Sequence, residues 1–185
     1  YLSQSKLNDK TIVYGNLDKK LQPLTPNFKN IDLTGKVIQK SLGYTKQLYN
    51  DYLIEKYLII EIHNRPESLL FLLRKKIKAK LTFIFHNNPI EMRGSTTVNE
   101  RKFIAENCDY VYFVSKWVKD KFFEGLPYNH RNNCEILYPA IKPLKKFPKK
   151  QKLIIFCGKL NSSKGYDMFG SSVIKILEKY NDWNA

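Results

Sequence analysis

The chain has 185 residues, 43% of them hydrophobic, and its 32 Lys and Arg against 17 Asp and Glu give a formal net charge of +15. This length suffices for one domain, or for one domain and a fraction of a second, and the apolar content suffices for a buried core. No apolar run reaches the roughly 20 residues that span a bilayer. The positive charge favours an anionic partner, which could be a nucleic acid, an acidic membrane surface or a phosphorylated substrate.

Short apolar strands alternate with helical patterns over the first 140 residues. Strands are expected at 11–16, 57–63, 80–86, 109–114 and 135–138. Helices are expected at 37–54, 66–78, 97–107 and 116–125. Pro66 suits the first turn of a helix, and the Ser115 side chain can cap another. This alternation predicts an α/β fold in which one parallel sheet has helices on both faces.

The pattern breaks at "PAIKPLKKFPKKQK", residues 139–152, which hold three prolines and six lysines. Such a composition is typical of an exposed linker. A strand at 153–157 and a helix after Gly165 then restart the alternation. We therefore expect one domain over 1–140, a linker over 141–152 and the start of a second domain over 153–185. Because the chain begins with Tyr1 and stops after a helix, we expect it to be an internal piece of a longer protein.

Three cysteines, Cys108, Cys134 and Cys157, lie far apart in the sequence. They form neither a CxxC pair nor a metal-binding spacing, so no metal site is expected. Two of them lie at the edges of apolar runs, where a small buried thiol is expected. This pattern fits a reducing cytoplasm.

Two histidines end neighbouring strands of the expected sheet. His63 and His86 are each followed by Asn and then Pro, in "HNRPE" and "HNNPIEMRG". Ligands of parallel α/β sheets bind outside the carboxyl ends of the strands, so both loops are expected to face one crevice. A histidine there can donate a hydrogen bond or shuttle a proton. The alternative is a histidine that merely ends a strand and bonds to backbone.

The same two loops contain further polar residues. Arg65 and Arg93 could bind a phosphate or carboxylate, or could be solvated surface residues. Asn87 and Glu91 are candidates for the acceptor side of a cleft, with Glu91 placed to serve an acceptor hydroxyl. Glu67 is better explained as a residue of a first helical turn.

The stretch "LIIFCGKLNSSKGYDMF", residues 153–169, combines a strand, a polar loop and a new helix. Gly158 permits a tight exit from the strand, and Asn161, Ser162 and Ser163 are candidate caps for the helix. Lys159 and Lys164 beside a helix N-terminus would suit a phosphate. The alternative is an ordinary turn with solvated lysines. The loop is neither a Walker A loop nor a G-x-G-x-x-G motif.

This stretch resembles the donor-binding segment of GT-B glycosyltransferases of family 4, in which Gly158, Lys159, Lys164 and Gly165 match the family's pattern. The upstream order "EIHNRP", "FIFHNNP", "CDYVYFVSKWVKDKFF" and "EILYPAIKP" is also similar. The resemblance covers about residues 55–180.

The resemblance implies two Rossmann-like domains across a cleft, with a nucleotide-sugar donor on the second. Lys159 and Lys164 would hold the donor diphosphate, and His86 would lie by the reacting sugar as the catalytic residue. The family implies a retaining, metal-independent transfer to a glycan or lipid-linked acceptor, such as a cell-surface polysaccharide or lipopolysaccharide precursor. No cofactor is expected, since the nucleotide-sugar is a substrate. A cytoplasmic location follows, with the basic linker as a candidate contact for the anionic inner face of the membrane.

The sequence departs from the family at residues 139–142, Pro-Ala-Ile-Lys, where many members have Asn-Gly-Val-Asp. The family's N-terminal Gly-rich loop and C-terminal Glu-rich motif are absent, so this piece alone is expected to be inactive. Two alternatives stay open. One is a basic nucleic-acid-binding α/β module, and the other is a non-catalytic sugar-phosphate-binding relative. No nucleic-acid partner is expected, because Phe and Tyr fall mostly inside apolar runs rather than among the basic residues.

Overall fold

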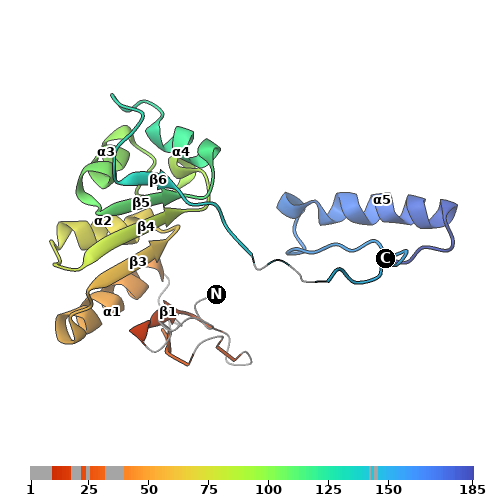
Figure 1. Ribbon diagram of the computed structural model, residues 1–185, viewed down its shortest axis with the longest axis horizontal. Coiled ribbons are helices and arrows are strands. Elements are labelled where there is room, and N and C mark those ends of the chain that lie inside the picture. Colours follow the sequence, from red (N-terminus) through yellow and green to blue (C-terminus); the bar gives the residue numbers. More distant parts are fainter. Residues whose placement is uncertain (1–9, 18–21, 24–25, 32–39, 142, 144–145) are drawn as a thin grey trace. The chain divides into compact units, whose positions relative to one another are not determined.

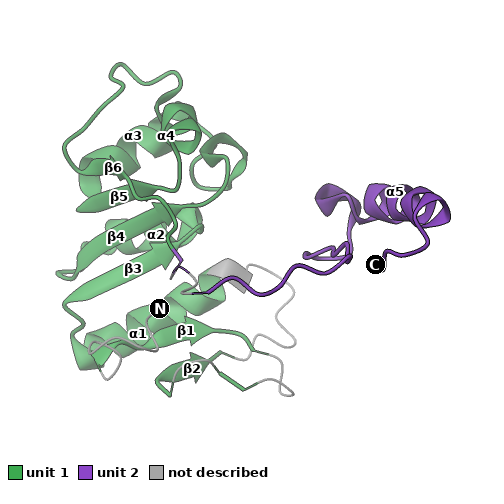
Figure 2. Ribbon diagram, turned by 45° about the vertical axis from the view of Figure 1, so that its right-hand side comes forward, with its two compact units in different colours: residues 1–140 green, residues 141–185 purple. Residues whose placement is uncertain are grey.

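The computed structural model describes residues 10–17, 22–23, 26–31, 40–141, 143 and 146–185. These residues belong to two compact units, Tyr1–Ala140 and Ile141–Ala185 (Figure 2). None of the described helices is both long and apolar enough to cross a membrane.

The first unit is built around a sheet of four parallel strands in the order β3-β4-β5-β6 (Figure 1). The strands are β3 (Ile59–His63), β4 (Lys80–Phe85), β5 (Tyr110–Phe113) and β6 (Cys134–Ile136). The helices are α1 (Lys40–Glu55), α2 (Pro66–Arg74), α3 (Val98–Asn107) and α4 (Lys116–Phe123). Parallel neighbours need a crossover connection, and α2, α3 and α4 supply the three. The expected parallel α/β arrangement is confirmed, and it is consistent with a Rossmann-like sheet.

Local sequence explains where these helices begin. Pro66 occupies the first turn of α2, where its missing N–H costs nothing. Thr97 and Glu100 form a capping box on α3, in which each side chain accepts a hydrogen bond from the other residue's backbone N–H. Ser115 caps α4 by accepting from Val118 N, as expected. Of the predicted helix at 37–54, residues 37–39 lie outside the described residues.

One face of the sheet forms the core. Strand register places Ile62 beside Phe83, and Phe85 beside Phe113, on the same face. These phenylalanines are fully buried with residues of the helices, since one core cluster contains side chains of α1, α2, α3 and α4. Those helix residues are Tyr52, Leu69, Leu70, Leu72, Ile104, Ala105, Val118, Phe122 and Phe123.

The expectation of helices on both faces is wrong for the described helices. The order β3-β4-β5-β6 always advances in one direction, and right-handed crossovers then place every connecting helix on the same face. The opposite face carries Glu61, His63, Tyr110 and Glu135, all of them exposed. This open face therefore presents polar and aromatic side chains beside the exposed Ile59, and it also carries Thr82 and Ile84, which are buried.

The expectation of a single sheet over residues 1–140 is also wrong. The predicted strand near 11–16 forms β1 (Val13–Gly15), which pairs in parallel with β2 (Phe28–Asn30) and not with the four-stranded sheet. Side chains connect β1 to the rest of the unit, because the Tyr14 hydroxyl donates to Asp51 Oδ2 at 2.6 Å. At three residues without alternation, β2 gave no recognisable sequence signal.

The second unit contains a 3-10 turn, η4 (Ser162–Lys164), and helix α5 (Tyr166–Lys179). The expected strand at 153–157 is wrong, since this segment makes only an isolated bridge, Leu153 to Asn184. A strand needs a neighbour to pair its backbone groups, and the described part of this unit offers no second strand. The described residues of the expected linker are exposed.

Candidate functional site

The two strand-end histidines lie against each other. His63 is the last residue of β3 and His86 follows β4, and His63 Nδ1 is 3.0 Å from His86 Nε2. Their rings stack with centroids 5.3 Å apart and an interplanar angle of 28°. The sequence placed both at neighbouring strand ends, and the structure adds a direct hydrogen bond between them.

Glu61 extends this pair, and the sequence reasoning missed it. Its Oε1 lies 2.7 Å from His63 Nε2, on the side of the His63 ring away from His86. Residues two apart in a strand project from the same face of a sheet, so Glu61 and His63 lie on the open face together. The alternation in "IIEIH" was the signal that could have identified this carboxylate.

Asn64 fixes the geometry between the two strand ends. Its backbone adopts φ of 54°, a left-handed conformation that asparagine tolerates better than most residues. Its Oδ1 accepts hydrogen bonds from the backbone N–H groups of His86, at 3.1 Å, and Asn87, at 3.2 Å. One side chain therefore ties the start of the second loop to the first.

Buried polar contacts hold the longer loop after β4. Ser95 is fully buried and its Oγ donates to Pro89 O at 2.6 Å. The buried Arg101 guanidinium donates to four backbone carbonyls, those of Ser95, Thr96, Phe122 and Glu124. Burial lowers the pKa of Arg101, and these carbonyls compensate for the desolvated charge. The loop is therefore part of the folded core.

Gly94 brings this loop onto the N-terminus of α2. Its φ is +91°, and a Cβ at this position would lie 2.5 Å from Glu67 N. Only glycine permits both the conformation and the approach. The loops after β3 and β4 therefore meet closely.

The charged residues of these loops already have partners. Arg93 Nη2 lies 3.3 Å from Glu67 Oε1, and Arg65 lies over the Tyr44 ring with its Cζ 5.3 Å from the centroid. Glu67 is in the first turn of α2, as expected. Glu91 Oε1 accepts from Asn88 Nδ2 at 2.8 Å within the 3-10 turn η3 (Pro89–Glu91). A ligand would exchange contacts with Arg93 and Glu91 rather than find them unpaired.

Glu61, His63 and His86 form a histidine cluster whose electrostatics are asymmetric. Desolvation by burial, and then the neighbouring His63, lower the pKa of His86. The hydrogen bond from His63 lowers the pKa of Glu61. At neutral pH the cluster therefore combines a Glu61 carboxylate with a neutral His86.

In the second unit, the loop Gly158–Gly165 folds back on itself. A Cβ at Gly158 would lie 3.9 Å from Lys164 Cβ, and Lys164 N donates to Asn161 O at 3.0 Å. Lys159 and Lys164 are exposed, and among the described residues neither ammonium has an ion-pair or hydrogen-bond partner. Both charges are therefore open to an anion.

The expected caps of α5 are not formed. Asn161, Ser162 and Ser163 lie in and before η4, and the residue that precedes α5 is Gly165, with φ of +70° and no side-chain cap. The caps fail because η4 separates these side chains from the helix start. A backbone hydrogen bond runs from Phe169 N to Gly165 O. The backbone N–H groups of residues 166–168 therefore lie before this bond, at the N-terminus of the helix. Asp167 lies in this first turn and competes with an incoming anion.

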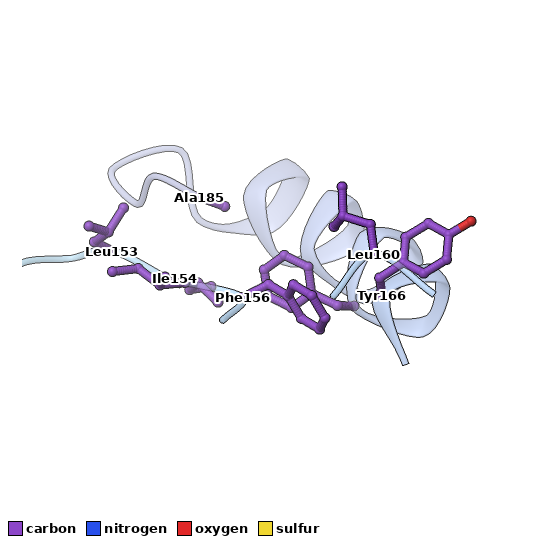
Figure 3. A pocket seen from close by; sticks show the side chains of 8 residues that line it. Leu153, Ile154, Phe156, Leu160, Tyr166 and Ala185 are labelled. Atoms are coloured by element: carbon purple, nitrogen blue, oxygen red, sulfur yellow. The ribbon is translucent and has the colours of Figure 1, made fainter. Parts of the chain in front are cut away.

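An apolar hollow of about 450 Å³ lies between segment 153–156 and α5 in the second unit (Figure 3). Its lining consists of Leu153, Ile154, Ile155, Phe156, Leu160, Tyr166, Phe169 and Ala185. Figure 3 shows the Tyr166 hydroxyl pointing away from the other labelled side chains. Without charged groups in its lining, the hollow is suited to apolar packing rather than to a phosphate.

The cysteines do not contribute to a site. Cys108 and Cys134 are buried, and burial raises their pKa to about 12 and about 11 respectively, whereas Cys157 is exposed. Among the residues that the structure describes, no group of three His, Cys, Asp or Glu side chains could hold a metal ion.

Comparison of the chain with models of protein families, with curated proteins and with solved structures finds no match. The function is therefore argued from the histidine cluster and from the loop Gly158–Gly165, the lysine loop, which carries Lys159 and Lys164.

Proposed function

We propose that this chain is part of a glycosyltransferase of the GT-B type, similar to family 4, that transfers a sugar from a nucleotide-sugar donor to a glycan or lipid-linked acceptor. Residues 1–140 would form the acceptor-side domain, and 153–185 would begin the donor-binding domain. Transfer would retain the anomeric configuration and use no metal. The proposed location is cytoplasmic, with the basic linker close to an anionic membrane surface.

The observation that carries the proposal is the open lysine loop at Gly158–Gly165. Two ammonium groups with no side-chain partner among the described residues lie on a loop that leads into a helix start without a side-chain cap. A helix N-terminus and nearby lysines both stabilise negative charge, so together they favour a diphosphate. Such a site can stabilise a leaving nucleoside diphosphate without a metal.

The histidine cluster supports a second role, at the reacting sugar. His86 is exposed at the carboxyl end of a parallel strand, the position at which α/β sheets bind their ligands. Its Nε2 bonds to His63, and its Nδ1, which has no partner in the described part of the chain, would receive a ligand hydroxyl. Arg65, Asn87, Glu91 and Arg93 lie in the adjoining loops and are proposed to contact the acceptor.

The direct test is sugar transfer by the full-length protein. A panel of UDP-, GDP- and ADP-sugars is incubated with lipid-linked and free glycan acceptors, with and without EDTA. We expect release of one nucleoside diphosphate with a matching glycoside product, unchanged by EDTA. NMR of the anomeric proton is expected to show retention. Absence of transfer and of donor hydrolysis across the panel would contradict the proposal.

Salt dependence separates this function from nucleic-acid binding. Phe83, Phe85 and Phe113 are buried, which removes them as base-stacking platforms. The stacked pair Tyr110 and Tyr112 on the open face is the feature that would favour a nucleic acid. Tight single-stranded binding that weakens steeply between about 50 and 200 mM salt would support that alternative. Nucleotide-sugar binding is expected to change far less.

A further inference from the structure

We propose that Glu61, His63 and His86 form a proton relay, in which a proton accepted at His86 Nδ1 leaves its positive charge on His63, beside the Glu61 carboxylate. The relay assigns positioning roles to Glu61 and His63. It rests on the proposed function only in taking the proton-donating ligand group to be a sugar or acceptor hydroxyl.

Two hydrogen bonds connect the three side chains in series. Glu61 Oε1 is 2.7 Å from His63 Nε2, and His63 Nδ1 is 3.0 Å from His86 Nε2. Within the part of the chain that the structure describes, three of the four ring nitrogens have one partner each, and His86 Nδ1 is the end of the series without one. Backbone bonds to Asn64 Oδ1 hold His86 in register with β3.

These bonds determine where the protons lie in the resting state. The Glu61 carboxylate can only accept, so His63 Nε2 carries a proton. In neutral His63, Nδ1 is then an acceptor, so His86 Nε2 must donate to it. Neutral His86, an exposed residue, consequently has a bare Nδ1, and this atom is a hydrogen-bond acceptor and a base.

Proton uptake proceeds without leaving charge on His86. Nδ1 of His86 binds the incoming proton as His86 Nε2 passes its own proton to His63 Nδ1. His63 then holds protons on both nitrogens and is a cation paired with the Glu61 carboxylate. His86 is neutral again, but its Nδ1 now donates, so one proton converts the free end of the relay from acceptor to donor.

The surroundings favour this distribution of charge. The lowered pKa of His86 disfavours a cation at the ligand end of the relay, whereas His63 is next to a carboxylate. The charged groups of the adjoining loops are engaged elsewhere, Glu67 with Arg93, Glu91 with Asn88, and Arg65 with Tyr44, and the remaining charged residue of α2, Arg74, lies in its last turn. Glu61 is thus the one carboxylate with a described bond to the histidine pair.

Nitrogen-15 NMR of the chain can test the relay directly, because the chain has only three histidines. The 15N shift separates protonated from bare ring nitrogens. At high pH we expect His86 protonated on Nε2 and bare on Nδ1. At the first protonation of the pair we expect His63 to be protonated on both nitrogens and His86 to change to Nδ1–H. A first step that leaves His86 doubly protonated would overturn the relay.

Matched variants sharpen the test. Glu61→Gln keeps the shape but removes the charge, and we expect the first protonation of the pair to move down by about 0.5 to 1 pH unit. Glu135→Gln, an exposed glutamate on β6 of the same sheet, is expected to leave it unchanged. His63→Phe keeps an aromatic ring without hydrogen bonds, so His86 is expected to lose its fixed tautomer. Unchanged titration in Glu61→Gln would contradict the proposal.

Kinetics of the full-length protein separate the relay from the proposed function. Glu61→Gln is expected to lower kcat by about 10-fold with little change in KM, and to move the acidic limb of the pH–rate profile in the same direction as the NMR titration. A relay seen by NMR in a protein that transfers no sugar would support this inference while contradicting the proposed function. Sugar transfer with an unchanged pH–rate profile in Glu61→Gln would support the proposed function while contradicting the relay.

Discussion

The two candidate regions hold their functional groups in different ways. In the first unit, the loops after β3 and β4 are fixed by Asn64, Gly94 and Arg101, and most of their charged side chains are paired. In the second unit, Lys159 and Lys164 are exposed and without partners among the described residues. The first region therefore has fixed geometry, and the second has available charge.

Two glycines with positive φ make this difference concrete. A Cβ on Gly94 would collide with backbone of Glu67, whereas a Cβ on Gly165 would meet nothing within 4 Å. A positive φ thus accompanies a close contact between two loops at Gly94, and an uncrowded helix start at Gly165. A site that orients a reacting group needs the former, and a site that binds a mobile polyanion can use the latter.

The largest effect is expected from the fixed region. His86→Ala in the full-length protein should lower kcat on the order of 100- to 10,000-fold, because it removes the group that contacts the ligand hydroxyl. Melting temperature should change little, since the side chain is exposed. His130→Ala is the control, as His130 is an exposed histidine outside these loops. Near-normal turnover in a folded His86→Ala protein would make His86 a structural residue.

Substitutions of Gly94 and Gly165 test the difference between the two regions next. Gly94→Ala should lower the free energy of unfolding by more than about 2–3 kcal/mol, because backbone strain and a backbone clash add. Gly165→Ala should cost only about 1–2 kcal/mol of left-handed strain. Denaturant titrations can follow each unit by fluorescence, with Trp117 in the first and Trp183 in the second, each in a variant lacking the other tryptophan. Equal losses would remove the distinction between the regions.

Substitution in the lysine loop should lower the affinity for a nucleoside diphosphate. A charge-assisted hydrogen bond contributes roughly 1.5–3 kcal/mol, so Lys164→Ala should weaken nucleoside diphosphate binding by about 10- to 150-fold. Calorimetry on the full-length protein with UDP, GDP, ADP and their nucleosides measures this loss. Lys175→Ala, on the exposed middle of α5, is the control. Equal losses for nucleoside and diphosphate would mean that Lys164 does not contact the diphosphate.

The sequence predicted the four strands of the larger sheet, and the helices between them, because the signals for these elements are local. Apolar periodicity, Pro66 and the Ser115 cap act within a few residues, and each lies where expected. Pairing between strands depends on residues far apart in the sequence, and this explains the two wrong predictions about strands. The 153–157 segment has strand composition without a described neighbour, and β1 pairs with the unforeseen β2.

The candidate site shows the same limit. Strand ends located His63 and His86, but their mutual bond depends on register between strands, which the sequence did not specify. Glu61 could have been found from alternation alone. The Arg101 contacts to the carbonyls of Phe122 and Glu124 could not, because these residues lie more than 20 positions away in the sequence.

The smallest expected effect is the contribution of Glu61 to stability. Its pKa is lowered in the fold by the hydrogen bond from His63, so the unfolded chain binds more protons near pH 4 than the folded one. This contribution is fully present above the unfolded pKa of about 4.3 and disappears as the pH falls through the lower folded value. Because the Glu61 side chain is 48% exposed, the difference between wild type and Glu61→Gln at pH 7 should stay below about 1 kcal/mol. Urea titrations from pH 7 downward should show that difference shrinking only below about pH 4.3, with none in Glu135→Gln. A difference that persists at the lowest pH would assign the role of Glu61 to packing rather than to charge.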